Sequence, residues 1–294
     1  LTAVNVTCLL YISVRFVFVY AYLCSPMKEG DLPAQPLENS GFQIVRPIAF
    51  TVGATCTFYA GAAIFAFENR NVAIRSHITE HVRRIWPPEQ STTTRESAGK
   101  KAGALRQQIN AWWNGQHPGQ RVFWGIFAAN AAVLGLWQIP RLSGVMARYF
   151  LHSASSRTIA PMLLANFSHK SVMHFSCNMF VLYSFSHSAS TVLGQEQFVA
   201  TYLSAGVISA LASHLHQVVM KVPTGSLGAS GAIMGILGVV CSAMPDARLC
   251  VVFLPMLTFG AFTALKSLIV FDSLGTCMHN LLRGVYLIMR FNRH

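Results

Sequence analysis

Long apolar stretches separated by short polar segments dominate this chain. Many of them approach 20 residues, which is long enough for a helix to cross a bilayer. They predict one span at about 47–67 and a core that begins at Val122. The pattern therefore indicates an all-α fold, a polytopic helical membrane bundle with a six-helix core and one extra N-terminal span. The core spans are expected at 122–139, 171–188, 197–219, 230–244, 249–271 and 274–289.

The same pattern divides the chain into four segments. Residues 1–46 are an N-terminal segment, apolar up to Cys24 and then a polar linker. Its apolar part is either a further span or the remnant of a targeting segment. Because the chain begins with Leu rather than Met, we expect it to be processed or a fragment. The other expected segments are the extra span at 47–68, a basic loop at 69–121 and the membrane core at 122–294.

Composition supports a membrane protein over two soluble domains. Hydrophobic residues make up 53% of the chain and charged residues only 11%, whereas soluble domains have roughly 25% charged residues. The seven cysteines are scattered without a C-x-x-C pair. They are therefore interpreted as small buried side chains and not as a disulfide or zinc framework.

Positive charge is concentrated in the 69–121 loop. This segment holds nine Lys or Arg residues against three Glu residues. Such a loop is typical of the cytoplasmic or matrix side of a membrane protein. Binding of nucleic acid or of acidic lipids is the alternative, but the loop carries no nucleic-acid-binding motif. We therefore expect the protein to have the lipid bilayer as a partner, and no nucleic acid.

Four polar residues share one depth of the predicted bundle. Counting spans places the starts of the second, fourth and sixth core spans on the same side of the membrane. These starts hold His174, Ser230 and His279, and Asn178 shares a helix face with His174 at i and i+4. Each residue alone also has a packing interpretation: His174 and Asn178 bond each other or join helices, and Ser230 lies among small residues that let helices approach.

Together these residues have the components of serine-protease chemistry. A serine nucleophile needs a base, and a developing oxyanion needs fixed donors. No carboxylate is well placed to orient His279, so the pattern favours a Ser–His dyad. The H-E-x-x-H motif of zinc proteases and the paired Asp residues of aspartyl proteases are absent. His214-x-His216 is weak evidence for a metal without a carboxylate, and we expect no metal and no cofactor.

His174-x-x-x-Asn178 and Gly228-Ala229-Ser230-Gly231 resemble the rhomboid intramembrane serine proteases, in particular their mitochondrial members. The resemblance implies that Ser230 is the nucleophile and His279 the general base. It implies an oxyanion hole formed by His174, Asn178 and the Ser230 N–H group. The implied reaction is peptide-bond hydrolysis in or near transmembrane segments of membrane-anchored proteins. The implied location is the mitochondrial inner membrane, and no cofactor is implied.

The last predicted span departs from the rhomboid pattern. That family usually has Gly three and seven residues after the histidine, where this chain has Leu282 and Tyr286. Arg283 also lies within the span. Bulky residues at these positions are expected to push the last helix away from the Gly-rich fourth core span. The alternative hypothesis is therefore a catalytically impaired rhomboid-like protein that binds transmembrane helices without cleaving them.

Overall fold

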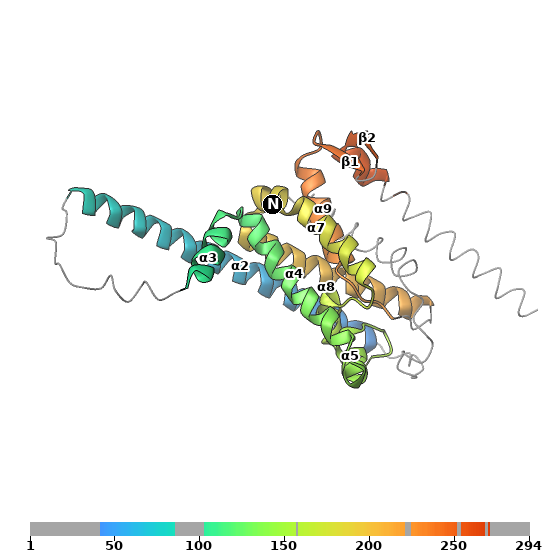
Figure 1. The fold of residues 1–294 in the computed structure, drawn as a ribbon. Coiled ribbons are helices and arrows are strands. Elements are labelled where there is room, and N and C mark those ends of the chain that lie inside the picture. Colours follow the sequence, from blue (N-terminus) through green and yellow to red (C-terminus); the bar gives the residue numbers. More distant parts are fainter. Residues whose placement is uncertain are drawn as a thin grey trace, which may run out of the picture.

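The computed structural model describes residues 42–85, 103–156, 158–220, 225–251, 254–267 and 270. Its architecture is a bundle of helices with one small hairpin of two strands (Figure 1). The predicted helical membrane bundle is therefore confirmed. The apolar stretch at 1–24 lies outside the described residues, as does the predicted span at 274–289.

Helix α2 (Phe42–Ile85) contains the predicted extra span and continues well beyond it. It lies alongside α8 (Gln195–Met220), and its C-terminal end projects beyond the bundle (Figure 1). Polar contacts tie the two helices together: the Tyr59 and Thr201 hydroxyls are 3.1 Å apart, and Asn69 Nδ2 donates to a Glu196 carboxylate oxygen at 2.7 Å. The first part of the predicted basic loop is thus helical.

Helix α3 (Ala104–Gly115) precedes the core, which begins with α4 (Pro118–Trp137). His117 caps α4: its Nδ1 accepts from the Gly119 N–H at 3.2 Å, and its own N–H donates to the Gln120 side chain at 3.1 Å. The chain then bends by 96° at Pro140, where the ring removes a helical hydrogen bond. Two short helices follow the bend: η3 (Pro140–Leu142) and α5 (Ser143–Phe150).

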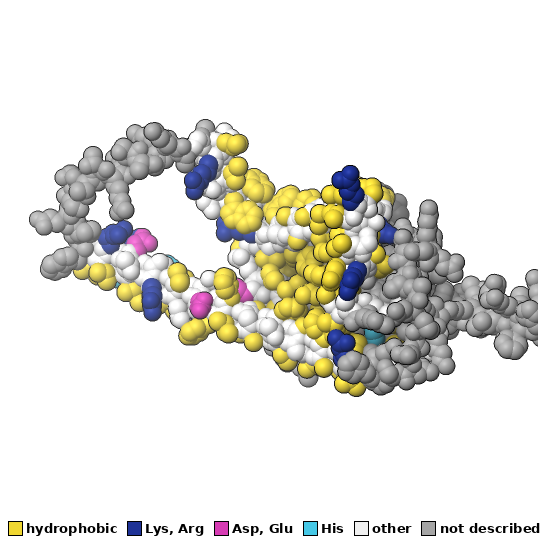
Figure 2. Space-filling model, turned by 90° about the horizontal axis from the view of Figure 1, so that it is seen from below, with side chains coloured by type: hydrophobic (Ala, Val, Ile, Leu, Met, Phe, Trp, Pro, Cys, Tyr) yellow, Lys and Arg dark blue, Asp and Glu magenta, His cyan; other side chains and the backbone are white. Residues whose placement is uncertain are grey.

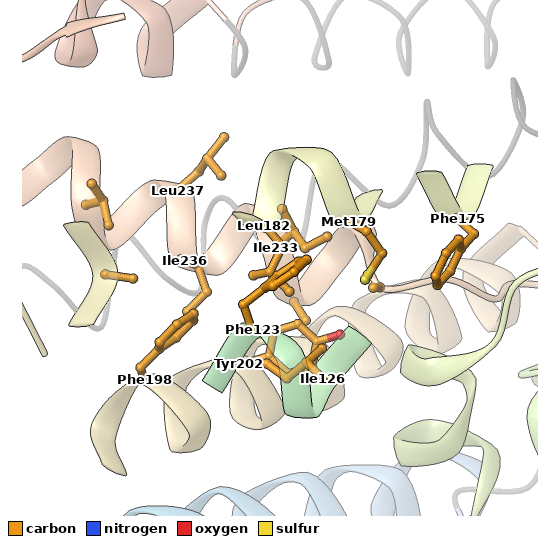
Figure 3. Packing of buried hydrophobic residues seen from close by; sticks show 14 residues of the cluster. Phe123, Ile126, Phe175, Met179, Leu182, Phe198, Tyr202, Ile233, Ile236 and Leu237 are labelled. Carbon is orange, nitrogen blue, oxygen red and sulfur yellow. The ribbon is translucent and has the colours of Figure 1, made fainter. Parts of the chain in front are cut away.

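The remaining described helices surround a short central one. After α6 (Pro161–Leu164) and η4 (Ala165–Phe167) come α7 (Val172–Leu193), α8 and α9 (Ser230–Ala243). α9 packs against α7 and α8, and Ile233 and Ile236 on it are almost fully buried. Figure 3 shows these side chains meeting aromatic and aliphatic residues of α4, α7 and α8. This cluster is the main hydrophobic core of the bundle.

α9 is shorter than the membrane is thick. At about 1.5 Å per residue, its 14 residues cover roughly 21 Å, whereas the hydrocarbon core of a bilayer measures about 30 Å. α9 alone is therefore too short to cross the whole hydrocarbon layer.

The predicted fifth core span at 249–271 is wrong in its first half. Strands β1 (Arg248–Val251) and β2 (Leu254–Gly260) form an antiparallel pair there, and residues 261–267 are helical. Val, Phe and Thr residues favour extended backbone. Pro255 also disfavours a helix interior because it lacks an N–H group. Apolar length alone therefore did not distinguish strand from helix.

Length and composition single out two described helices, α2 and α8, as able to cross a membrane, or three if α4 and the bent segment after it are one span. α9 is apolar but shorter. Figure 2 shows a broad hydrophobic area over the bundle, with Lys and Arg side chains mainly toward its two ends. This arrangement suits a protein whose middle lies in lipid and whose ends meet water.

Candidate active site

Ser230 is the first residue of α9, at the end of a short loop that several backbone hydrogen bonds hold in place. Ser226 in this loop exchanges two backbone hydrogen bonds with His152, at 2.9 and 2.8 Å. The Gly228 N–H donates to the Ala165 carbonyl at 2.9 Å. The loop is thus fixed to two segments of the chain that precede α7. Ser230 itself is only partly buried.

Gly228 brings His174 close to this loop. Its φ of +125° lies in the region that favours glycine. A Cβ at this position would lie 2.8 Å from Cε1 and 3.2 Å from Nε2 of His174. Only glycine therefore allows the imidazole to pack against the backbone two residues before Ser230. The structure thus places His174 of α7 against the loop that ends at Ser230 of α9.

His174 and Asn178 are held in the first turns of α7. The Ser171 hydroxyl caps the helix by accepting from the His174 N–H at 3.4 Å. Both side chains are buried, with 8% and 5% of their surfaces exposed. Asn178 Nδ2 lies 2.9 Å from Nε2 of His169. The packing interpretation had His174 and Asn178 bond each other or join helices, and in the structure Asn178 bonds His169.

His169 is the site-adjacent residue that the sequence did not reveal. It lies two residues before the N-cap of α7, is fully buried, and its ring centroid is 4.9 Å from that of His174. Burial, followed by a contribution from His174, lowers the pKa of His169 to about 3, so the ring is neutral at physiological pH. Its spacing to Asn178, nine residues, follows no helical period. The sequence feature that could have pointed to His169 is its place in a short loop just before the polar start of α7.

A second polar group supports the loop from the α8 side. Gln217 accepts from the Ala154 N–H at 2.8 Å and donates to the Ser213 hydroxyl at 3.1 Å. The Ser213 hydroxyl in turn donates to that of Ser226 at 3.4 Å. This chain of hydrogen bonds links α8, the segment after α5 and the loop before Ser230.

The His214-x-His216 pair does not lie in a metal site within the described part of the chain, where no group of three or more metal-binding side chains exists. His214 instead lies near His152, with ring centroids 5.5 Å apart. Burial, followed by the effect of His214, lowers the pKa of His152 to about 3. His152 is therefore a neutral, buried histidine beside the loop.

The arrangement assembles hydrogen-bond donors next to a partly exposed hydroxyl. The first N–H groups of any helix lack intrahelical partners, and α9 makes its first such bond only from the Ile233 N–H to the Ala229 carbonyl. The imidazole of His174 and the amide of Asn178 lie on the neighbouring helix. Such donors fit an anionic oxygen. His279, Leu282, Arg283 and Tyr286 lie outside the described residues.

These features define a helical membrane protein with a serine at the N-terminus of a short buried helix. The family model described as "Rhomboid domain" matches residues 156–280. The chain belongs to the rhomboid family and has its intramembrane protease-like fold. No solved structure matches it.

Several curated proteins resemble most of this chain. It is 45% identical over 253 residues to the mouse presenilin-associated rhomboid-like protein, mitochondrial, with 82% of this chain and 64% of the relative covered. It is 37% identical over 265 residues to the zebrafish presenilin-associated rhomboid-like protein A, mitochondrial, with 83% and 67% covered. Yeast rhomboid protein 1, mitochondrial, is 29% identical over 165 residues, with 55% and 47% covered.

The chain spans about 64% of the length of the mouse relative. The mitochondrial relatives and the membrane-spanning helices identify a mitochondrial multi-pass membrane protein.

Proposed function

We propose that this protein is an intramembrane serine protease of the mitochondrial inner membrane. Its substrates are membrane-anchored proteins, which it cleaves in or near their transmembrane segments. One observation carries the proposal: Ser230 begins α9, and the His174 ring packs against Gly228 of the loop that presents it. This supports the proposal, because the buried imidazole lies against the backbone two residues before the helix N-terminus that carries the Ser230 hydroxyl.

In this mechanism the Ser230 hydroxyl oxygen attacks the carbonyl carbon of the scissile peptide bond. His279 accepts the hydroxyl proton and then delivers it to the leaving amine. Water hydrolyses the resulting acyl-enzyme, with His279 again as the base. The proton moves within a Ser–His dyad, and no metal or cofactor takes part.

The oxyanion of each tetrahedral intermediate meets donors from two helices. The Ser230 N–H group lies at the start of α9, where the positive end of the helix dipole adds to the attraction. His174 and Asn178 donate from α7. His174 and Asn178 are buried in the first turns of α7, and donors held in this way need little reorganisation when charge develops.

Labelling with a fluorophosphonate probe tests the proposal. We expect the purified protein in detergent to be labelled, and Ser230→Ala and His279→Ala to abolish labelling. Ser184→Ala is the matched control, because Ser184 is an exposed serine of α7 that bonds only its own helix at the Phe180 carbonyl. It should label like the wild type.

Two outcomes oppose the proposal in different ways. Equal labelling of the wild type and Ser230→Ala shows that another residue is the nucleophile. No labelling of the wild type, while an active rhomboid labels in parallel, favours the rhomboid-like protein that binds transmembrane helices without cleaving them.

A further inference from the structure

We infer that His169 is a positioning residue that fixes the amide of Asn178, so that its nitrogen and not its oxygen serves the oxyanion. This inference rests on the proposed protease function. His169 has no place in the reaction described above, because it acts only through Asn178.

With Nδ2 of Asn178 facing His169, the hydrogen bond between the two side chains has a single polarity. Nδ2 of Asn178 lies 2.9 Å from Nε2 of His169, and an amide nitrogen can only donate. Nε2 therefore accepts, and the proton of the neutral imidazole resides on Nδ1. Asn178 uses one amide hydrogen in this bond and keeps the second for a ligand. The lowered pKa of His169, about 3, agrees with a ring that accepts at Nε2.

The location of this bond directs the amide toward the site. The His169 ring meets His174 edge to face, at an interplanar angle of 68°, and His174 packs against Gly228. Nδ2 of Asn178, which faces His169, therefore lies on the side of the amide toward His174 and the loop before Ser230. A donor-only group in place of His169 would attract the Asn178 oxygen to that end, where it would repel a negative charge.

The surroundings of His169 keep its ring in place. Ser168, which precedes it, is fully buried and accepts from Trp137 Nε1 at 2.7 Å. Lys170, which follows it, places its ammonium group 4.8 Å from the centre of a Trp137 ring. Trp137 thus anchors both neighbours of His169. The ring is also 5.7 Å from that of Phe175, so it has little freedom to turn.

Three substitutions test the inference with a fluorogenic peptide that includes a transmembrane segment. His169→Leu removes the acceptor, and His169→Lys replaces it with a donor. We expect kcat to fall about 100-fold in both, the loss typical of one oxyanion donor, with KM nearly unchanged. His169→Gln offers an amide oxygen near the position of Nε2 and should recover most of the lost kcat. His187→Leu, at the opposite end of α7, is the control and should match the wild type.

A double substitution separates positioning from general packing. If His169 acts through Asn178, His169→Leu costs no further kcat in an Asn178→Ala background. The inference would be overturned if the two losses in kcat were additive in the double variant. It would also be overturned if His169→Leu and His169→Gln had equal kcat at matched thermal stability. If His169→Leu kept the wild-type kcat, only the inference about His169 would be overturned, and the proposed protease function would stand. Absence of cleavage by the wild type would remove the proposed function, and this inference with it.

Discussion

Two pairs of histidines lie at opposite ends of α7, and only one of them adjoins the candidate site. At the N-terminal end, His169 and His174 have ring centroids 4.9 Å apart. At the C-terminal end, His187 and His117 are closer, at 3.9 Å. The first pair is buried, whereas His187 is exposed and His117 only partly buried. Proximity of two imidazoles therefore does not distinguish the site.

The surroundings of each pair make the difference. The buried pair meets Asn178 and the Gly228 loop that leads into α9. In the other pair, Nδ1 of His117 already accepts from the Gly119 N–H and lies 3.4 Å from the Ser190 hydroxyl. That nitrogen has a structural role as the cap of α4. We therefore expect changes at the two ends to separate activity from stability.

Among substitutions that leave Ser230 and His279 in place, Gly228→Ala should have the largest effect on activity. The added Cβ would contact the His174 ring at 2.8 Å, and the φ of +125° would strain any residue with a side chain. A shift of about 1 Å at a reacting centre costs on the order of 100-fold in rate, and a displaced His174 would also be lost as a donor, at about 100-fold or more. We therefore expect kcat/KM to fall by more than about 1,000-fold.

Gly119→Ala is the counterpart at the other end of α7. Its Cβ would collide with the Ser186 carbonyl oxygen and the Ser190 hydroxyl. We expect a lower thermal unfolding temperature with normal activity per folded molecule. Normal activity in Gly228→Ala would contradict the comparison, since it would show that His174 and the loop need not be in contact.

Asn178→Ala should have the next largest effect. Loss of one oxyanion donor typically lowers kcat about 100- to 1,000-fold, and we expect KM to change little. His117→Ala removes a side-chain cap instead, which costs about 1 kcal/mol of stability. A kcat loss in His117→Ala as large as that in Asn178→Ala, measured on folded protein, would show that the two ends are not independent.

Stability should depend on pH mainly through the buried histidines. The pKa values of His169 and His152 are lowered to about 3 in the folded protein, against about 6.5 in an unfolded chain. Between these values the unfolded state binds more protons, so stability is full above pH 6.5 and falls as the pH drops toward 3. Thermal unfolding in detergent across this range measures the slope.

The double variant His169→Gln and His152→Gln identifies the source of that slope. It should unfold with a weaker dependence on pH below 6.5, because both titrating groups are gone. An unchanged slope would assign the acid sensitivity to other groups.

The smallest effect should follow His187→Ala. This side chain is exposed, and surface substitutions of this kind usually change stability by less than about 0.5 kcal/mol. Activity should stay at the wild-type level in the peptide assay. A clear loss of activity would mean that the exposed pair influences the distant site.

The sequence predicted the first four core helices well because each combines an apolar run with a clear stop. Pro140 ends the region of α4, and Gly194 with a φ of +81° separates α7 from α8. The start of α9 at Ser230 agrees with the predicted span start. The predicted depth of His174 and Ser230 followed from counting these spans, and the packing of His174 against Gly228 agrees with it.

What the sequence missed depends on contacts between distant segments. The position of His169 follows from Trp137, which holds the residues on either side of it, and no local spacing reports that contact. The β1–β2 hairpin was missed for a different reason. Its residues are apolar enough to predict a membrane span. That apolar length favoured a helix in the prediction, although the β-branched and aromatic residues favour strands. The assignment of His279 as the base stays a prediction.

The backbone pairs that fix the Ser230 loop also lead us to expect a particular order in which the candidate site forms. His152 pairs with Ser226, and Ala165 pairs with Gly228, so each bond closes a long stretch of chain that includes α7 and α8. Such non-local contacts form late, because the chain between them must first be ordered. We therefore expect Ser230 to reach its final surroundings only after the helices around it have packed, and the candidate site to be among the last described parts to assemble.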